Sequence, residues 1–512
     1  MEPVHPTRDG PWDRPRNRRE ILKLGAVLAA GAAVTPLVAA CGASSATATR
    51  SAGTGGALAG PITVITGAGA DPTVRPALKQ VYDDFKARNP GIEWDIRALP
   101  GGGPEWDRLA RATVTSGEPV GLVMIDGQQV RGWVRDGLLA DLSGDPGMAA
   151  VLARVPDRFH LSGPGEDATR AFPLALTGGV HTTGIYYNKA LLDRASLGPP
   201  RSISDLKAMV KPLAALGVAP LVHCSGDVFF NQILMTWVLP MIAERTRGPL
   251  EFAESTVRGD IAYDGAEWLE AFETIADLRT SGVLLEGSGA TDYAAMQQLL
   301  LQGKAAMTFN GSWLLPQLLA GSPSVPFDLH VAPPPLVDGA SRPRPILSWG
   351  GIALPATAAA SRDSVYAFLD YASQPSVDRS IVEGLQVYSP IAASNGAITN
   401  EVAQEFLPMF ENAITPLDWL WEPEITAEID SQVQGLVKGA TDPRSAAQAV
   451  EAVAQGLHAA GRSYYPGPAG REAGLQSHQG PRSTVTRQCP AACSTPSSTR
   501  PGREAVWSLV RG

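Results

Sequence analysis

The stretch that decides the fold is PITVITGAGAD, residues 61–71. Ile62, Val64 and Ile65 form a short β-rich run that ends in two glycines, which predicts a strand followed by a tight loop. The next segment, RPALKQVYDDFKARNPG at residues 75–91, spaces its apolar side chains along one helical face and stops at Asn-Pro-Gly. We therefore expect the folded part of the chain to begin near residue 61.

The same alternation continues along the chain. IEWDIRAL (92–99) alternates like a strand, PEWDRLARATVTSG (104–117) predicts a helix, and VGLVMID (120–126) predicts a buried strand ending at Asp126. This order predicts an α/β unit with a mostly parallel sheet. Further strands are expected in residues 182–188, 303–311 and 345–355, and further helices in residues 202–217, 361–373 and 442–461.

Composition excludes several classes of protein. The 512 residues suit two or three packed units, and no segment beyond the first 41 residues is long and apolar enough to span a bilayer. The net charge is −9, and basic residues gather near the two ends, so the middle is more acidic still. Such a surface argues against a nucleic-acid partner. Four cysteines give neither a disulfide framework nor a zinc module, and we expect no cofactor or metal.

The first 41 residues have the parts of an export signal. RREILKLGAVLAAGAAVTPLVAAC, residues 18–41, joins a basic end, an apolar middle and small residues before a cysteine. Arg18 and Arg19 resemble the twin-arginine export motif, although Asn17 replaces its usual Ser or Thr, and residues 38–41 resemble a lipobox in which Cys41 carries lipid. The general secretory route stays open as an alternative. Residues 41–60 are predicted to form a flexible tether, and residues 464–512 a disordered tail.

Three later segments resemble the extracellular solute-binding proteins of ABC importers, the family related to maltose-binding protein. They are residues 185–221, beginning IYYNKALL, residues 299–313, LLLQGKAAMTFNGSW, and residues 348–373, beginning SWGGIALP. The resemblance implies a two-lobed, periplasmic-binding-protein-like α/β fold of type II, with a ligand cleft at a hinge that the chain crosses several times. The implied first lobe is 61–175 plus 311–360, and the second is 182–308 plus 363–463.

The resemblance also implies a function. The protein would be the lipid-anchored substrate-binding component of an ABC importer, exported and held on the outer face of the cell membrane. It would act as a monomer, capture a mono- or oligosaccharide between its lobes and deliver it to the transmembrane permease subunits. The ligand would stabilise the closed form of the protein by contacts with both lobes. No catalysis is implied.

A sugar-binding site needs aromatic rings that stack on the apolar faces of the sugar and polar groups that hydrogen-bond its hydroxyls. The chain has 11 Trp, several at turns or element ends. By the resemblance, Trp313 is the stacking aromatic, Trp419 and Trp421 close the cleft from the second lobe, and Asp126 offers a carboxylate at a strand's carboxyl end. The other candidates are Asp227 with Phe229, Trp349 with Gly350 and Gly351, and Trp106.

Other ligands and classes of protein remain open. Tyr186 and Tyr187 resemble the tyrosines that some relatives use for ferric iron, and acids such as Asp126, Asp227 and Asp418 would suit a polyamine. A secreted carbohydrate-active enzyme would need two carboxylates, and Glu422, Glu424 and Glu428 gather near Asp418, a pattern more typical of a solvated helix face. We find no hydrolase, metalloprotease or P-loop motif, and assign neither His181 nor His223 to a metal. The many tryptophans at loop ends favour carbohydrate.

Overall fold

The computed structural model describes residues 58–100, 103–162, 168–319, 327–357 and 362–462. The predicted export signal with Arg18 and Arg19, the lipidation site Cys41, most of the tether and the tail from 464 lie outside these residues.

Nine strands form one sheet. They are β1 (Ala59–Thr66), β2 (Gly91–Ala98), β3 (Val120–Asp126), β4 (Ala171–Phe172), β5 (Val180–Asn188), β6 (Ala219–Leu221), β7 (Ala305–Gly311), β8 (Leu329–Ala332) and β9 (Leu347–Ala353). Their order is β2-β1-β3-β9-β5-β7-β6, with β4 beside β9 and β8 beside β5. β1 pairs in parallel with β2 and β3, and β6 with β7, whereas every pair that contains β5 or β9 is antiparallel. The parallel pairing predicted from the first strands is therefore confirmed for β1–β3, whereas the strands that cross between the halves pair antiparallel.

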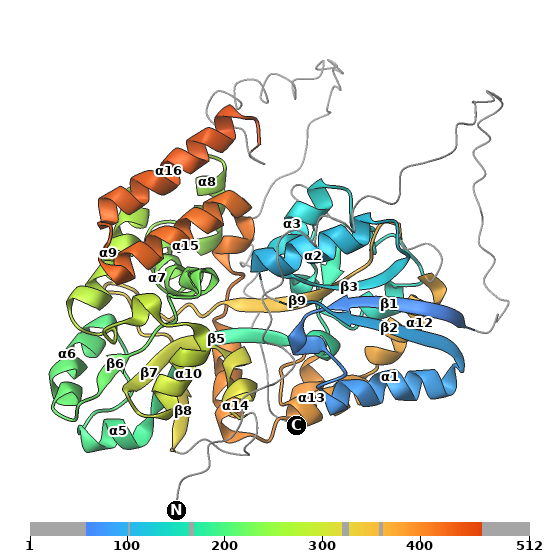
Figure 1. The fold of residues 1–512 in the computed structure, drawn as a ribbon, viewed down its shortest axis with the longest axis horizontal. Helices are drawn as coiled ribbons and strands as arrows, with labels where there is room; N and C mark the ends of the chain where they lie inside the picture. Colours follow the sequence, from blue (N-terminus) through green and yellow to red (C-terminus); the bar gives the residue numbers. More distant parts are fainter. Residues whose placement is uncertain (1–57, 101–102, 163–167, 320–326, 358–361, 463–512) are drawn as a thin grey trace, which may run out of the picture. The chain divides into compact units, whose positions relative to one another are not determined.

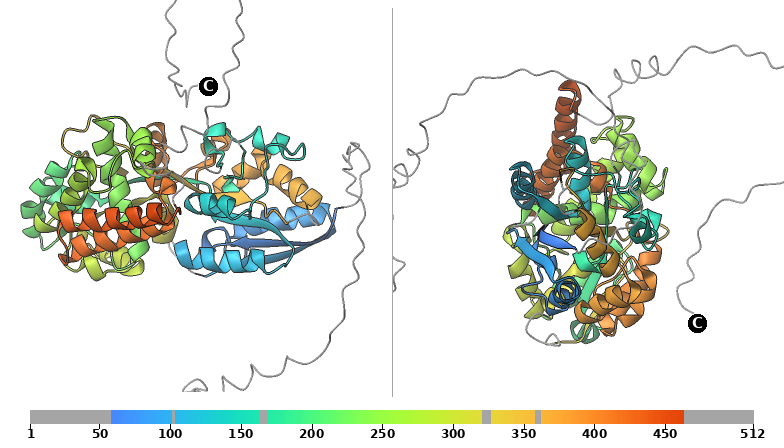
Figure 2. Two further views of the ribbon diagram at one scale, coloured as in Figure 1. Left: turned by 90° about the horizontal axis from the view of Figure 1, so that it is seen from above. Right: turned by 90° about the vertical axis from the view of Figure 1, so that its right-hand side faces the viewer.

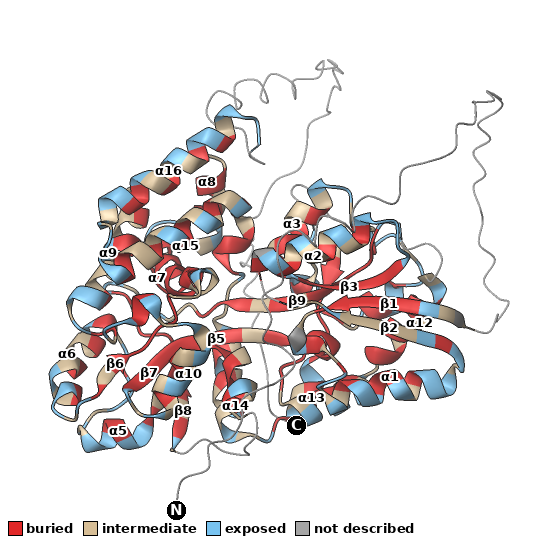
Figure 3. Cartoon of the chain, viewed as in Figure 1, coloured by how far each residue is buried: buried red, intermediate tan, exposed pale blue. Residues whose placement is uncertain are grey.

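Helices cover the sheet, and they form where the sequence offers an apolar stripe. They are α1 (Pro76–Arg88), α2 (Gly103–Thr115), α3 (Gly127–Arg135), α4 (Ala149–Leu152), α5 (Lys189–Arg194), α6 (Ile203–Ala214), α7 (Gln232–Glu244), α8 (Pro249–Val257), α9 (Ala266–Thr280), α10 (Tyr293–Leu301), α11 (Leu315–Leu318), α12 (Arg362–Ala372), α13 (Pro375–Leu385), α14 (Glu401–Phe406), α15 (Pro423–Lys438) and α16 (Pro443–Ala459). In α1, for example, Leu78, Val81, Tyr82 and Phe85 are buried while the opposite face is exposed. Figure 3 shows this division on most outer helices. The alternation of strands and helices confirms the predicted α/β class.

β5 and β9 join two halves of the described chain (Figure 1). β9 pairs with β3 through Gly350–Ala353, and its other end, Leu347–Trp349, pairs with Val180–Thr182 of β5. The rest of β5 pairs with β7 and β8. β9 therefore pairs with the first half, β5 pairs with the second half, and the two strands pair with each other between the halves. We call the half with β1–β3 the first half and the half with β6–β8 the second half.

The helices divide between the halves by packing rather than by order along the chain. α7, α9, α15 and α16 pack together on the second half, where the Trp237 ring stacks on Phe309 with centroids 4.7 Å apart. The segment 363–463 was predicted to belong wholly to the second lobe. In the structure, α12 and α13 pack against α1 of the first half, whereas α14 packs against β8 of the second half. Figure 2 shows the orange α12 and α13 beside the blue α1 and β1 in a second view.

Candidate functional site

A cavity of about 340 Å³, which we call the cleft cavity, lies where the ends of β3, β5 and β9 meet residues 416–419. Its wall combines five aromatic side chains with acidic and amide groups. The aromatic residues are Phe229, Phe230, Trp313, Trp349 and Trp419, and the polar ones are Asp126, Gln128, Thr177, His181, Gln232, Thr236, Ser348 and Asp418. These residues come from both halves and from the strands that join them.

Asp126 supplies the acidic group of the first half. It ends β3 and precedes α3, whose first turn it caps, and its backbone N–H donates to Oε1 of Gln129 at 3.2 Å. The Gln129 amide in turn donates to the carbonyl of Gly103 at 3.1 Å, which ties α3 to the start of α2. The Asp126 side chain is exposed to the cavity, but protein surrounds it, and this burial raises the pKa of Asp126 to about 6. The carboxyl end of a strand thus presents the carboxylate to the cavity.

Asp418 supplies the acidic group of the second half. It lies in a short 3-10 helix, Leu417–Leu420, and only 6% of it is exposed. Its Oδ1 has no hydrogen-bond partner among the described residues, and burial raises the pKa of Asp418 to about 7. Asp430 of α15 is buried nearby, and its pKa is raised by burial and by the charge of Asp418.

The aromatic rings stand around these carboxylates. Trp313 is half-buried, and its ring meets that of His181 edge-on with centroids 5.7 Å apart. Trp419 meets Trp349 in the same way at 4.6 Å. The indole N–H of Trp349 is buried with no partner in the described part of the chain. Burial lowers the pKa of His181 to about 4, so this imidazole is neutral at pH 7. The cavity therefore offers both apolar ring faces and hydrogen-bonding groups.

Two rings of the second half lie directly against glycines of the first half. A Cβ atom at Gly127 would overlap the Trp419 ring, and one at Gly103 would lie 2.7 Å from the Phe229 ring. Beside them, Nη1 of Arg135 on α3 lies 3.7 Å from a carboxylate oxygen of Glu422. Because glycine has no side chain, these positions let the two halves touch beside the cavity.

The structure brings six of the ten predicted ligand contacts to this cavity and leaves four elsewhere. Trp313, Asp126, Trp419, Trp349, Gly350 and Phe229 line it. Trp421 packs in the second-half core against Trp268, with ring centroids 5.4 Å apart. Trp106 is buried and donates from Nε1 to the carbonyl of Thr66 at 3.2 Å. Asp227 accepts the backbone N–H of Tyr293 at 2.7 Å, and Gly351 is buried within β9.

Several lining residues were not among the predicted contacts. Gln232 and Thr236 face the cavity from α7, and they are four residues apart in a helix that is otherwise apolar up to its last residue, Glu244. That spacing was a usable signal, because residues i and i+4 share a helix face. Thr177 donates its hydroxyl to the carbonyl of Gly350 at 2.6 Å. It holds the two joining segments together at the cavity wall.

The iron alternative has no geometric support at this cavity. The Tyr186 hydroxyl donates to the carbonyl of Gly311 at 2.9 Å, and Tyr187 stacks on His330. Within the described residues, no group of three or more His, Cys, Asp or Glu side chains could hold a metal ion. No helix in that part of the chain is both long and apolar enough to cross a membrane.

Residues 69–378 match the family model of the bacterial extracellular solute-binding proteins. The chain belongs to this family. Among relatives, it is 24% identical over 244 residues to proteins named "probable sugar-binding periplasmic protein" from Brucella suis biovar 1 (strain 1330) and Brucella melitensis biotype 1. Each match covers 46% of this chain and 54% of the relative, so the chain spans about half the length of these relatives.

Solved structures of other solute-binding proteins share the fold. The GacH receptor of Streptomyces glaucescens, solved free and with acarbose, superposes with a TM-score of 0.63 at 21% identity, covering 78% of this chain and 98% of that one. Maltose-bound MalE3 of T. maritima gives 0.62 at 17% identity, with 78% and 99% covered. The predicted two-lobed, periplasmic-binding-protein-like fold is thereby confirmed for this solute-binding protein.

Proposed function

We propose that this solute-binding protein captures a carbohydrate in the cleft cavity and delivers it to the membrane permease of an ABC importer. The observation that supports this most is the composition of the cavity wall, in which Trp313, Trp349 and Trp419 stand beside Asp126 and Asp418. Ring faces suit the C–H faces of a sugar, and carboxylates accept its hydroxyl protons. Sugar-binding names among the relatives and sugars in the solved neighbours support the same ligand class.

The cavity lies beside the strands that join the two halves, so a hinge motion of the halves would open or close it. We propose that α12 and α13 move with β1–β3 and α1 as one lobe, and that β6–β8 with α14–α16 move as the other. The division follows the packing, which places α12 and α13 against α1. Thr177, His181 and Trp349 belong to the joining segments. A ligand that touches both lobes would stabilise the closed arrangement by its difference in affinity between the two states.

We further propose that the protein is exported and anchored by lipid on Cys41, at the outer face of the membrane. The support is the sequence of residues 18–41, with paired arginines, an apolar run and small residues before the cysteine. Cys41→Ala should release a protein that still binds its ligand, measured by membrane fractionation. A variant that stays in the membrane fraction would contradict the anchor.

The ligand class is tested by a thermal-shift screen of the purified protein. Neutral mono- and oligosaccharides, amino acids, spermidine and ferric citrate are added separately. A ligand at 100 times its dissociation constant adds about 2.7 kcal/mol to the free energy of unfolding. We expect a rise in Tm with one class of sugar. A rise with spermidine or ferric citrate and with no sugar would overturn the carbohydrate assignment while leaving the fold intact.

A further inference from the structure

The second-half wall of the cleft cavity contains buried hydrogen-bond acceptors that the protein does not use. Asp418 is 6% exposed and Gln232 is 7% exposed, and both line the cavity. Oδ1 of Asp418 and Oε1 of Gln232 each lack a hydrogen-bond partner among the described residues. A buried polar atom without a partner costs on the order of 1–3 kcal/mol, and more if it is charged. Such atoms in a binding cavity indicate that the ligand completes them.

The surroundings of this wall are acidic. Asp430 is buried close enough to Asp418 to feel its charge, and Asp126 lines the first-half wall. The two walls meet next to these acids, because the Trp419 ring lies against Gly127. Trp419 directly follows Asp418 in the chain, and Gly127 directly follows Asp126. The lining contains neither lysine nor arginine, and its one histidine, His181, is neutral at pH 7. The cavity thus holds two carboxylates with no cation of its own.

We propose that Asp418 and Gln232 receive a protonated amine of the ligand, so that the protein prefers amino-bearing sugars to their neutral analogues. A sugar hydroxyl also donates a hydrogen bond, but it leaves the negative charge uncompensated. An ammonium group donates up to three hydrogen bonds and neutralises the charge, and charge-assisted bonds are roughly twice as strong as neutral ones. The remaining ring of the sugar would lie against the aromatic side chains that surround the acids.

This inference rests on the proposed capture of a carbohydrate, so the experiment separates the two. Isothermal titration calorimetry on the purified full chain at pH 7 compares matched probes, which differ at one substituent. The sets are glucose, glucosamine and N-acetylglucosamine, the corresponding galactose series, and cellobiose against the glucosamine disaccharide. We expect at least one amine to bind tenfold or more tightly than both of its neutral partners.

Two variants test whether Asp418 causes the preference for amino sugars. Asp418→Asn keeps the shape and removes the charge, so it should bind the amine and its neutral analogue within about threefold of each other. Glu411→Gln removes a carboxylate that lies outside the cleft cavity, and it should retain the wild-type preference. Equal affinities for amine and neutral sugars in the wild type, or a preference that survives in Asp418→Asn, would overturn this inference alone. Binding of none of these sugars, nor of any sugar in the thermal-shift screen, would overturn the carbohydrate function itself.

Discussion

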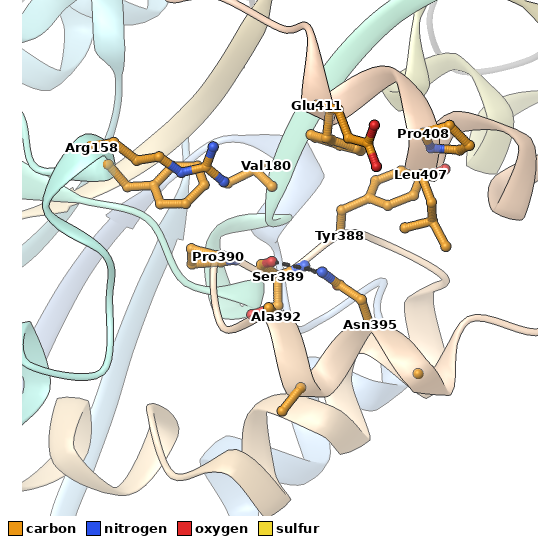
Figure 4. A pocket seen from close by; sticks show the side chains of 14 residues that line it. Arg158, Val180, Tyr388, Ser389, Pro390, Ala392, Asn395, Leu407, Pro408 and Glu411 are labelled. Carbon is orange, nitrogen blue, oxygen red and sulfur yellow. Dashed lines mark hydrogen bonds between the residues drawn. The ribbon is translucent and has the colours of Figure 1, made fainter. Parts of the chain in front are cut away.

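Two cavities lie on opposite faces of β5. His181 lines the cleft cavity, while the preceding residue, Val180, lines a second cavity of about 520 Å³, and neighbouring residues of a strand point to opposite faces. We call this second one the rear cavity (Figure 4). Only a few side chains separate the two, because the ring of Phe159 in the rear cavity meets that of Trp349 in the cleft cavity, with centroids 5.4 Å apart.

Three polar residues of the rear cavity, Tyr388, Ser389 and Asn395, have hydrogen-bond partners within the chain. The Tyr388 hydroxyl donates to the carbonyl of Ala403 at 2.7 Å. The Ser389 backbone N–H donates to Oδ1 of Asn395, and the Asn395 amide donates back to the Ser389 carbonyl, as Figure 4 shows. The Ser389 hydroxyl donates to Asp378. The smaller cleft cavity instead holds buried polar atoms that have no hydrogen-bond partner in the described part of the chain. Unused hydrogen-bonding capacity, and not volume, therefore distinguishes the candidate binding site from a cavity that serves the fold.

The largest expected effect is a loss of stability when Asp378, which lies beside the rear cavity, is substituted. Asp378 is fully buried and accepts hydrogen bonds from the backbone N–H of Ala175 and from Ser389. Asp378→Ala leaves both donors buried without an acceptor, and we expect it to lower the free energy of unfolding by about 3 kcal/mol, measured in urea. Asp378→Asn keeps one acceptor oxygen and should lose about half as much.

The affinity of these variants tests whether the rear side serves only the fold. The fraction of Asp378→Asn protein that remains folded should bind ligand within about threefold of the wild type. A loss of affinity as large as that of a cleft variant would show that the two cavities do not act separately.

The next largest expected effect is a loss of ligand affinity when an aromatic residue of the cleft cavity is substituted. Trp313→Ala removes a half-buried ring from the cavity wall and should weaken ligand binding by about 30-fold, or about 2 kcal/mol, measured by calorimetry. Phe410→Ala is its matched control, because it removes an aromatic ring from the rear cavity. We expect the control to change affinity less than twofold. Similar losses in both variants would contradict the assignment of the ligand to the cleft.

Part of this site was predictable because its residues follow recognisable landmarks. Trp313 lies two residues after the strand that ends in Asn-Gly, and Asp126 ends a strand that is buried along its whole remaining length. Neighbouring tryptophans were harder to separate. Trp419 and Trp421 are two residues apart around a short 3-10 helix, so they point in different directions, one to the cavity and one to Trp268. The amino-acid pattern alone does not fix that direction.

Burial caused by distant segments was not predictable from local pattern. Glu422 belongs to an acidic group that is typical of a solvated helix face, yet it is 2% exposed, and Arg135 on α3 of the other half lies beside it. The packing of α12 and α13 on α1 is of the same kind. An amphipathic helix shows that one of its faces is buried, but it does not show which part of the chain covers that face.

A glycine pair tests the contact between the halves. Gly127→Ala introduces a methyl group where the Trp419 ring lies, so the halves can no longer touch there without a shift. We expect about tenfold weaker ligand binding, and a closure on ligand addition that is smaller than in the wild type by small-angle scattering. Gly144→Ala is the control, since nothing lies within 4 Å of its added methyl group. Equal binding by both variants would show that Trp419 need not rest on Gly127 in the bound state.

The smallest effect is a dependence of apo stability on pH. Burial raises the pKa of Asp418 to about 7, above the usual value of about 3.9 for an unfolded chain, so the native state binds more protons between these values. The free energy of unfolding contributed by Asp418 therefore falls as the pH rises from about 4 to 7 and then levels off. Asp126, with a pKa of about 6, acts in the same direction. His181 acts in the opposite direction below pH 6.5, because burial lowers its pKa to about 4.

A difference between two proteins removes these competing contributions. Asp126, His181 and the Glu422–Arg135 pair surround Asp418 equally in the wild type and in Asp418→Asn. The pKa of Asp430 is raised in part by the charge of Asp418, so that coupling belongs to the measured difference. Urea unfolding between pH 5 and 8 should show the Asn variant gaining on the wild type as the pH rises, by on the order of 1 kcal/mol or more at pH 7.5. Parallel curves would mean that Asp418 ionises in the cavity as it does in water. The ionised Asp418 would then not destabilise the unliganded protein, and a ligand would have no such destabilisation to remove. The cleft cavity would differ from the rear cavity only in its aromatic rings.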